Sequence, residues 1–190
     1  MMPRTLHNLD AMVCVSALQK CIRRGLEREA MEFACELMHS SKAFFTMTAN
    51  RLEIVSHEDI GLADPQAVMF AATAIEQAKR HYDPEKPGKH RCMIGNAIRV
   101  LCQAVKSREG DHFQAAIGVP NKEEGIAPAI PEWAHDMHTM KGKRAGCDLE
   151  HFRRESAKLV PAASDDYEDE AYIVWARKQV RNSGGSKQPA

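Results

Sequence analysis

The chain has 190 residues, a length that fits one hydrophobic core with an appendage better than two full domains. Its 26 basic and 26 acidic residues balance, so no net charge draws it to DNA or to an anionic membrane, and any nucleic-acid contact must be a local patch. It has no 18-residue apolar run and no apolar signal core in MMPRTLHNLD, which predicts a cytoplasmic protein that does not enter a membrane.

Apolar residues recur at helical spacing through the first part of the chain. The first predicted helix carries apolar positions from Cys14 to Ile22, and Gly25 is well placed to end it. A second stripe covers residues 30–38, and a third helix can run from Phe44 to Ile60. Successive short connections between these segments favour helix pairs.

A turn rich in acidic residues follows the third predicted helix. Gly61 can close that helix at no steric cost, Asp64 can cap the next one, and Pro65 suits its first turn. The fourth helix then carries a face of small residues between positions 67 and 78, which lets a neighbouring helix come close. This spacing predicts a helix-turn-helix corner.

The clearest amphipathic helix comes after a turn-rich linker at residues 82–89. Its apolar stripe runs from Ile94 to Val105. The sequence shows no sustained period-two alternation and is only 6% aromatic, which argues against strands. We therefore predict an all-α fold, a bundle of antiparallel helix pairs.

Composition changes after Gly118. The stretch VPNKEEGIAPAIPEW holds three prolines and is interpreted as an irregular, extended connection. Residues 148–159 and 165–181 again have helical patterns. The predicted organisation is a helical core at 1–118, a Pro/Gly-rich connection with a helical tail at 119–183, and a disordered end at 184–190.

Three segments resemble one known family. They are RLEIVSHEDIGLADPQAVMFA at residues 51–71, SALQKCIRRGLEREAMEFACEL at 16–37 and AIRVLCQAVKS at 97–107. Together, over roughly residues 10–118, they resemble the C-terminal helical region of the MgsA/RarA (Werner-helicase-interacting protein) family of clamp-loader-like AAA+ ATPases. The resemblance implies a fold like the clamp-loader C-terminal collar domain. The residues that match the family's corner motif, with an expected structural role, are Glu58, Asp59, Gly61, Asp64 and Pro65.

The family's ATPases carry a phosphate-binding G-x-x-x-x-G-K-[ST] loop, and no such string occurs in these 190 residues. The chain should not hydrolyse ATP by that route. The resemblance implies a non-catalytic oligomerisation or adaptor module in DNA replication, recombination or repair, without a motor of its own and without a cofactor. It further implies a homotetramer, with fork DNA, single-stranded-DNA-binding protein or a separate AAA+ ATPase as partners.

The segment from Pro131 to Phe152 contains most of the residue types that do chemistry. His135 and His138 are three residues apart, a spacing that places both imidazoles on one side of a helical turn, where Cys147 or His151 could complete a metal site. Only one ligand pair is present, whereas strong zinc signals have two, so ordinary polar residues are the alternative. A small metal- or phosphate-binding enzyme with its site here is the alternative to the assembly module.

Two basic clusters are candidates for DNA or another anion. Lys141, Lys143 and Arg144 alternate with glycines whose backbone amides could help to hold a phosphate. The other cluster consists of Lys20, Arg23 and Arg24. The alternative for both clusters is a solvated surface.

Glu58 and Asp59 are a pair of neighbouring acids, which could divide general acid and base roles if burial separated their pKa values. Sequence neighbours on a helix point in different directions, so a structural role is favoured, with Arg51 or Lys20 as the expected partner. The chain has no G-x-S-x-G elbow and no cysteine with a recognisable catalytic signature. The six cysteines, spread without a C-x-x-C pair, are predicted to be reduced packing residues.

Overall fold

The computed structural model describes residues 3–184, with side chains described up to residue 180. Every named element in this range is a helix, and the only strand-like feature there is an isolated bridge between Arg4 and Asp10. The all-α prediction is confirmed. The chain divides into two compact units, residues 1–126 and 127–190, which are described separately below.

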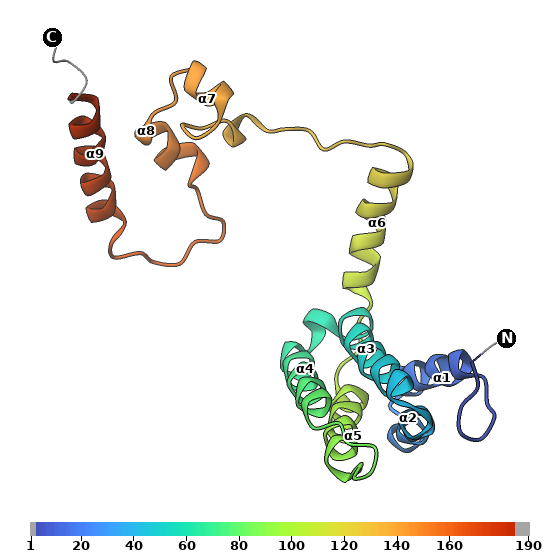
Figure 1. Cartoon of the computed structure of the whole chain (residues 1–190). Helices are drawn as coiled ribbons and strands as arrows, with labels where there is room; N and C mark the ends of the chain where they lie inside the picture. Colours follow the sequence, from blue (N-terminus) through green and yellow to red (C-terminus); the bar gives the residue numbers. More distant parts are fainter. Residues whose placement is uncertain (1–2, 185–190) are drawn as a thin grey trace, which may run out of the picture. The chain divides into compact units, whose positions relative to one another are not determined.

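The first unit is a helical bundle with one further helix (Figure 1). Helix α1 packs on α2, α4 packs on α5, and α3 contacts both pairs. Helix α6 follows α5 and contacts α3 and the short helix η1. Their bounds are α1 Ala11–Arg23, α2 Glu27–Ser40, α3 Lys42–Glu58, η1 Gly61–Ala63, α4 Pro65–Arg80, α5 Gly88–Gln103 and α6 Glu109–Glu123.

Local chemistry sets the corner between α3 and α4. Gly61 has a φ of +52°, a conformation that costs glycine little and other residues more. The Asp64 carboxylate accepts a hydrogen bond from the Ala67 amide at 3.0 Å, and Pro65 occupies the first helical position. The predicted stop, cap and start signals all act at the expected residues.

Helices α1, α2, α3, α4 and α5 together form the hydrophobic core, which is almost entirely apolar. Phe45 packs against Tyr82 and the buried ring of His90, with ring centroids 4.5 and 5.3 Å away. All six cysteines are free, and burial raises the pKa of the Cys102 thiol to about 11, which keeps it in the unreactive protonated form. The largest buried apolar side chains are Leu18, Ile22, Leu37, Leu52, Ile60, Ile75, Ile94, Ile98 and Leu101.

Helix α6 corrects part of the sequence analysis. The expected extended connection after Gly118 begins only beyond Glu123, because α6 continues through Pro120. Proline lacks the amide that would bond the Ala116 carbonyl, but α6 has no buried residue, so water can satisfy that carbonyl. The first unit accordingly extends to residue 126.

The second unit consists of short helices and one longer one. They are η2 Glu132–Ala134, α7 Met140–Arg144, α8 Leu149–His151, the π-helical turn η3 Phe152–Ser156, and α9 Glu168–Gly184. Both predicted helical segments, 148–159 and 165–181, are therefore helical over most of their length. The predicted disordered end lies outside the described residues from 185 onward. No helix in the described part is long and apolar enough to cross a membrane.

Candidate functional site

The acidic pair at the α3–α4 corner forms an ionic network with α1. Asp59 is only 1% exposed, and both its carboxylate oxygens accept from Nε of Arg23 at 2.8 Å. Nη2 of Arg23 donates to Glu58 at 3.0 Å, and the hydrogen bond to Asp59 raises the pKa of Arg23. The partners thus differ from those expected, since Arg51 bonds to Gln19, whose amide donates to both acids.

The same network holds the start of α6. Nη2 of Arg108 lies 3.2 Å from the Glu58 carboxylate, and the Ser107 amide donates to the Asp59 carbonyl at 2.9 Å. Arg108 also pairs with Asp111 in the first turn of α6. The acids at the corner therefore link three elements, and their charges are matched by arginines.

The three residues of the first basic cluster, Lys20, Arg23 and Arg24, have different partners. Arg23 is committed to Glu58 and Asp59. Lys20 and Arg24 are exposed; Nζ of Lys20 contacts the Ser16 hydroxyl, and Arg24 donates to the Lys20 carbonyl at 2.9 Å. Only these two side chains of the cluster present their charge to solvent, and their contact with an anion stays a prediction.

The three histidines of the predicted metal site are not brought together. His135 and His151 line one cavity of about 450 Å³ with Cys147, whereas His138 stacks edge-on against Phe152 at 5.4 Å. Within the described residues no group of three or more His, Cys, Asp or Glu side chains could hold a metal ion. The i, i+3 spacing does not bring the two rings together, because residue 135 lies in an irregular stretch and residue 138 in a turn, and neither belongs to a helix.

Gly142, one of the two glycines of the second basic cluster, has a packing role. A Cβ at Gly142 would lie 1.9 Å from the Asp136 carbonyl oxygen, so only glycine fits there. The amides of Gly142, Lys143 and Ala145 all donate to acceptors of the chain itself, which leaves none of the three for a phosphate. The side chains of Lys141, Lys143 and Arg144 are exposed. Their role as anion contacts stays a prediction, but these three backbone amides do not contribute to it.

The first unit has two apolar grooves that the sequence patterns do not predict. The first, which we call the η1–α6 groove, has a volume of about 810 Å³ between η1, α4 and α6. Leu62 is 94% exposed there, and Met69 and Phe113 are each 68% exposed. The apolar side chains that line it are Ile60, Leu62, Ala63, Pro65, Val68, Met69 and Phe113.

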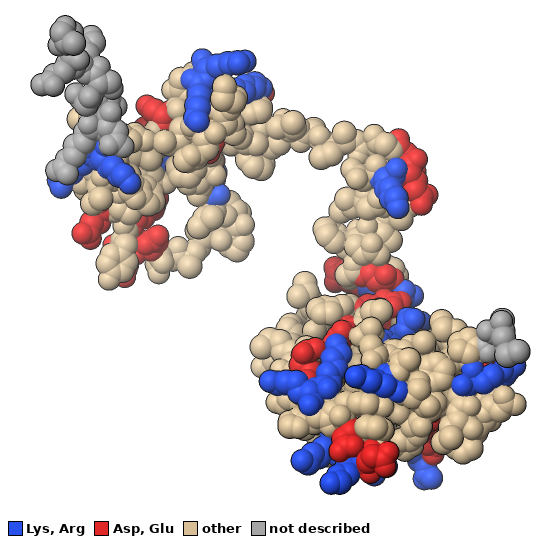
Figure 2. All heavy atoms as spheres, in the orientation of Figure 1, with Lys and Arg blue, Asp and Glu red and all other residues tan. Residues whose placement is uncertain are grey.

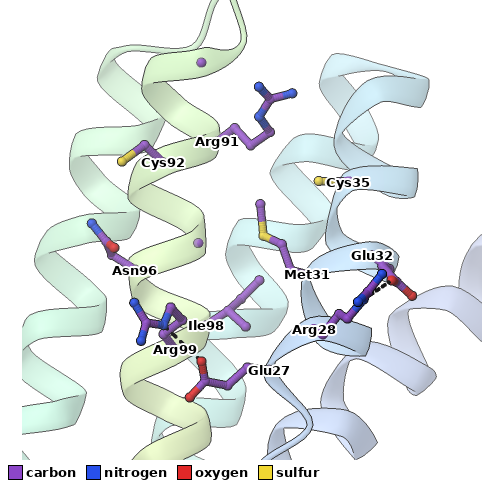
Figure 3. Close-up of a pocket in the computed structure, with 12 residues that line it drawn as sticks. Glu27, Arg28, Met31, Glu32, Cys35, Arg91, Cys92, Asn96, Ile98 and Arg99 are labelled. Carbon is purple, nitrogen blue, oxygen red and sulfur yellow. Dashed lines mark hydrogen bonds and ion pairs between the residues drawn. The ribbon is translucent and has the colours of Figure 1, made fainter.

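The second, which we call the α2–α5 groove, has a volume of about 780 Å³ between those helices (Figure 3). Met31 reaches from α2 toward α5 (Figure 3). Gly95 of α5 has no side chain, and Met31 is the residue that a Cβ there would contact. Arginines and glutamates stand around it, with Arg99 bonded to Glu27 at 2.9 Å. The isolated Gly95 inside a periodic helix was the one sequence signal that could have revealed it.

Basic and acidic side chains are interspersed on the face shown in Figure 2. No field of one sign dominates that view, as the balanced composition predicts.

An all-helical bundle with this capped corner is the architecture expected for the C-terminal region of an AAA+ ATPase. The family model described as "MgsA AAA+ ATPase C terminal" matches residues 29–172. The chain therefore belongs to the MgsA C-terminal family. It is also 36% identical over 141 residues to "Replication-associated recombination protein A" of Bacillus subtilis (strain 168). That alignment covers 72% of this chain and 31% of the relative, so the chain spans about a third of the relative's length.

The family match corrects the extent of the resemblance. The sequence segments had indicated similarity as far as residue 118, whereas the matched region continues to residue 172. It thus includes most of the second unit up to the first turns of α9. Short helices separated by turns give little periodicity, which is why the similarity there was missed.

Proposed function

We propose that this chain is a non-catalytic assembly module associated with DNA replication and recombination, and that it self-associates through the η1–α6 groove. Its membership of the MgsA C-terminal family and its similarity to a replication-associated recombination protein support the association. The observation that carries the self-association is the exposed apolar surface around α6.

Helix α6 has a low intrinsic stability. It contains Gly118 and Pro120, residues that cost a helix interior about 1 and 3 kcal/mol relative to alanine. None of its residues is buried, and isolated helices of this length are marginal in water. A partner that covers α6 would supply the missing burial.

The apolar residues of α6 are arranged for such a partner. Phe113 and Ile117 are four residues apart, so they lie on one face of the helix, and both are more than half exposed. Leu62 and Met69 line the same groove as Phe113. An exposed apolar patch of this kind marks an interaction site.

A second copy of the chain suits this surface. The surface has both a hollow and projecting apolar side chains such as Leu62, so two copies can exchange them about a two-fold axis. A tetramer, the state that the resemblance implies, would need a further interface. Fork DNA, single-stranded-DNA-binding protein and a AAA+ ATPase are the partners that we propose for the assembled module.

Sedimentation velocity over a concentration series tests this role. Phe113→Glu places a charge in the groove and should shift the protein toward monomer, with its far-UV circular dichroism otherwise preserved. The matched control is Val13→Glu on α1, because Val13 is similarly exposed, at 63%, and lies on a helix that does not line the groove. Identical sedimentation of the two variants and the unmodified chain would count against the proposal.

A further inference from the structure

Helix α5 contains a glycine that the fold does not require. Gly95 lies inside the helix, where it costs about 1 kcal/mol relative to alanine. A Cβ at this position would contact Cε and Sδ of Met31 at 3.7 Å, which is ordinary van der Waals contact. Alanine would therefore fit and strengthen the helix. What glycine does provide is open space in the α2–α5 groove.

The floor beneath that space is apolar and adaptable. Met31 and Cys35 of α2 are half-buried and face α5, and the buried Ile98 lies next to them. Methionine has a flexible, polarizable side chain and recurs at surfaces that accommodate apolar groups of a partner. The floor thus suits one or two apolar anchor side chains.

The first turns of α5, at its N-terminal end beside the groove, contain basic residues and no acidic ones. No side chain caps this end. Lys89 and Arg91 instead stand at this end, where the helix dipole already contributes positive charge and cations are unfavourable. Both are exposed and make no ion pair within the part of the chain that the structure describes.

Two more arginines, Arg28 and Arg99, line the edge of the α2–α5 groove, and both form exposed ion pairs. Arg28 pairs with Glu32 at 3.1 Å and Arg99 with Glu27 at 2.9 Å. Exposed pairs of this kind contribute at most about 1 kcal/mol, so an incoming carboxylate can share or replace the glutamates.

From these features we propose that the α2–α5 groove binds a short peptide segment of a partner protein, in which acidic residues flank apolar anchors. An open groove between two helices suits a peptide laid along it, as helix-in-groove recognition does. The apolar floor disfavours a nucleic-acid backbone, because it offers no charge partner to phosphates that are closely and regularly spaced. The groove shares no lining residue with the η1–α6 groove, so this proposal does not depend on self-association.

Selection of peptides from a random twelve-residue phage-display library on the full chain tests the proposal. The selected peptides, synthesised with a fluorophore, are titrated against the unmodified chain and three variants by anisotropy. Gly95→Met fills the groove and Arg91→Glu reverses the free charge; each should weaken binding about tenfold or more. Gly95→Ala, which adds only a Cβ in ordinary contact, is the matched control and should change the affinity by less than about threefold.

The expected peptides combine aspartate or glutamate with large apolar residues, and their binding should perturb the NMR signals of Met31 and Gly95. Peptides that bind Gly95→Met and Arg91→Glu as tightly as the unmodified chain would overturn the proposal, as would a selection that yields no binder. Arg91 is exposed, so its variant keeps the test valid even where Gly95→Met folds poorly. A changed subunit number in Gly95→Met would show the groove to be an interface between copies and would also overturn it.

Discussion

Nε of Arg23 lies 2.8 Å from both carboxylate oxygens of Asp59, a residue that is almost completely buried. The contact joins α1 to the end of α3 across 36 residues of sequence. A buried carboxylate is tolerated only when its charge is matched, and this one also receives a hydrogen bond from Gln19. The acidic corner motif therefore fixes the geometry of the bundle from which α6 departs.

Replacement of Asp59 by asparagine should be strongly destabilising, because it removes the buried charge that Nε of Arg23 contacts and leaves the guanidinium only its bond to the more exposed Glu58. We expect a loss of about 2–4 kcal/mol in the free energy of unfolding, measured by urea denaturation. Glu58→Gln is the control; Glu58 is more exposed, and its replacement should cost about 1 kcal/mol or less. Equal losses for the two variants would show that burial of Asp59 does not set the cost.

Gly61→Ala should destabilise the first unit through the backbone alone. The φ of Gly61 is +52°, and a Cβ there meets no atom within 4 Å, so the cost of about 1–2 kcal/mol is conformational. Gly95→Ala should do the reverse and stabilise α5 by up to about 1 kcal/mol. Thermal unfolding of both variants shows whether their changes in stability have opposite signs. Stabilisation by Gly61→Ala would contradict the requirement for glycine at this corner.

His90 should titrate below the ordinary histidine range. Burial is the main cause that lowers its pKa, and the charges of His39 and Arg91 lower it further, whereas a backbone hydrogen bond with His81 and the charge of Asp83 raise it. Because the folded-state pKa is depressed, the folded state binds the proton less well than the unfolded chain does. Stability is therefore fully present above about pH 6.5 and falls as the pH drops from there toward the folded-state pKa.

An NMR titration of the histidine ring signals measures the pKa of His90 directly. Exposed histidines such as His57 provide an internal comparison in the same sample. A pKa of His90 equal to or above that of the exposed rings would contradict the buried, neutral state inferred from its packing against Phe45 and Tyr82.

Gly142→Ala should disrupt the second unit, because the new Cβ would collide with the backbone of Asp136. Two-dimensional NMR should show large shifts among residues 127–180 and little change in residues 3–126. Ala145→Gly, at an exposed neighbouring position, should cause only local changes. Widespread shifts in the first unit would show that the two units are not independent.

Local signals accounted for much of the fold. Gly61 and Pro65 act through their own backbone conformation, and the Asp64 carboxylate bonds an amide only three residues away, so their roles could be predicted from the sequence. Helix α6 could not be predicted in full from the sequence. Gly118 and Pro120 have low helix propensities, yet the chain forms a helix through both.

The candidate sites depend on residues that are distant in the sequence. Met31 and Gly95 meet only once α2 packs on α5, and Leu62 meets Phe113 only once α6 has docked on η1. The sequence places Arg23 in a basic cluster, and only the fold brings it to its partner Asp59, 36 residues away. Pairings of this kind require the fold and cannot be derived from spacing along the chain.

Native mass spectrometry of the full chain at tens of micromolar reports directly whether the protein self-associates through the η1–α6 groove. We expect a species with more than one subunit, a tetramer by the family resemblance, which dissociates in Phe113→Glu but not in Val13→Glu. A monodisperse monomer of the unmodified chain at that concentration would contradict it.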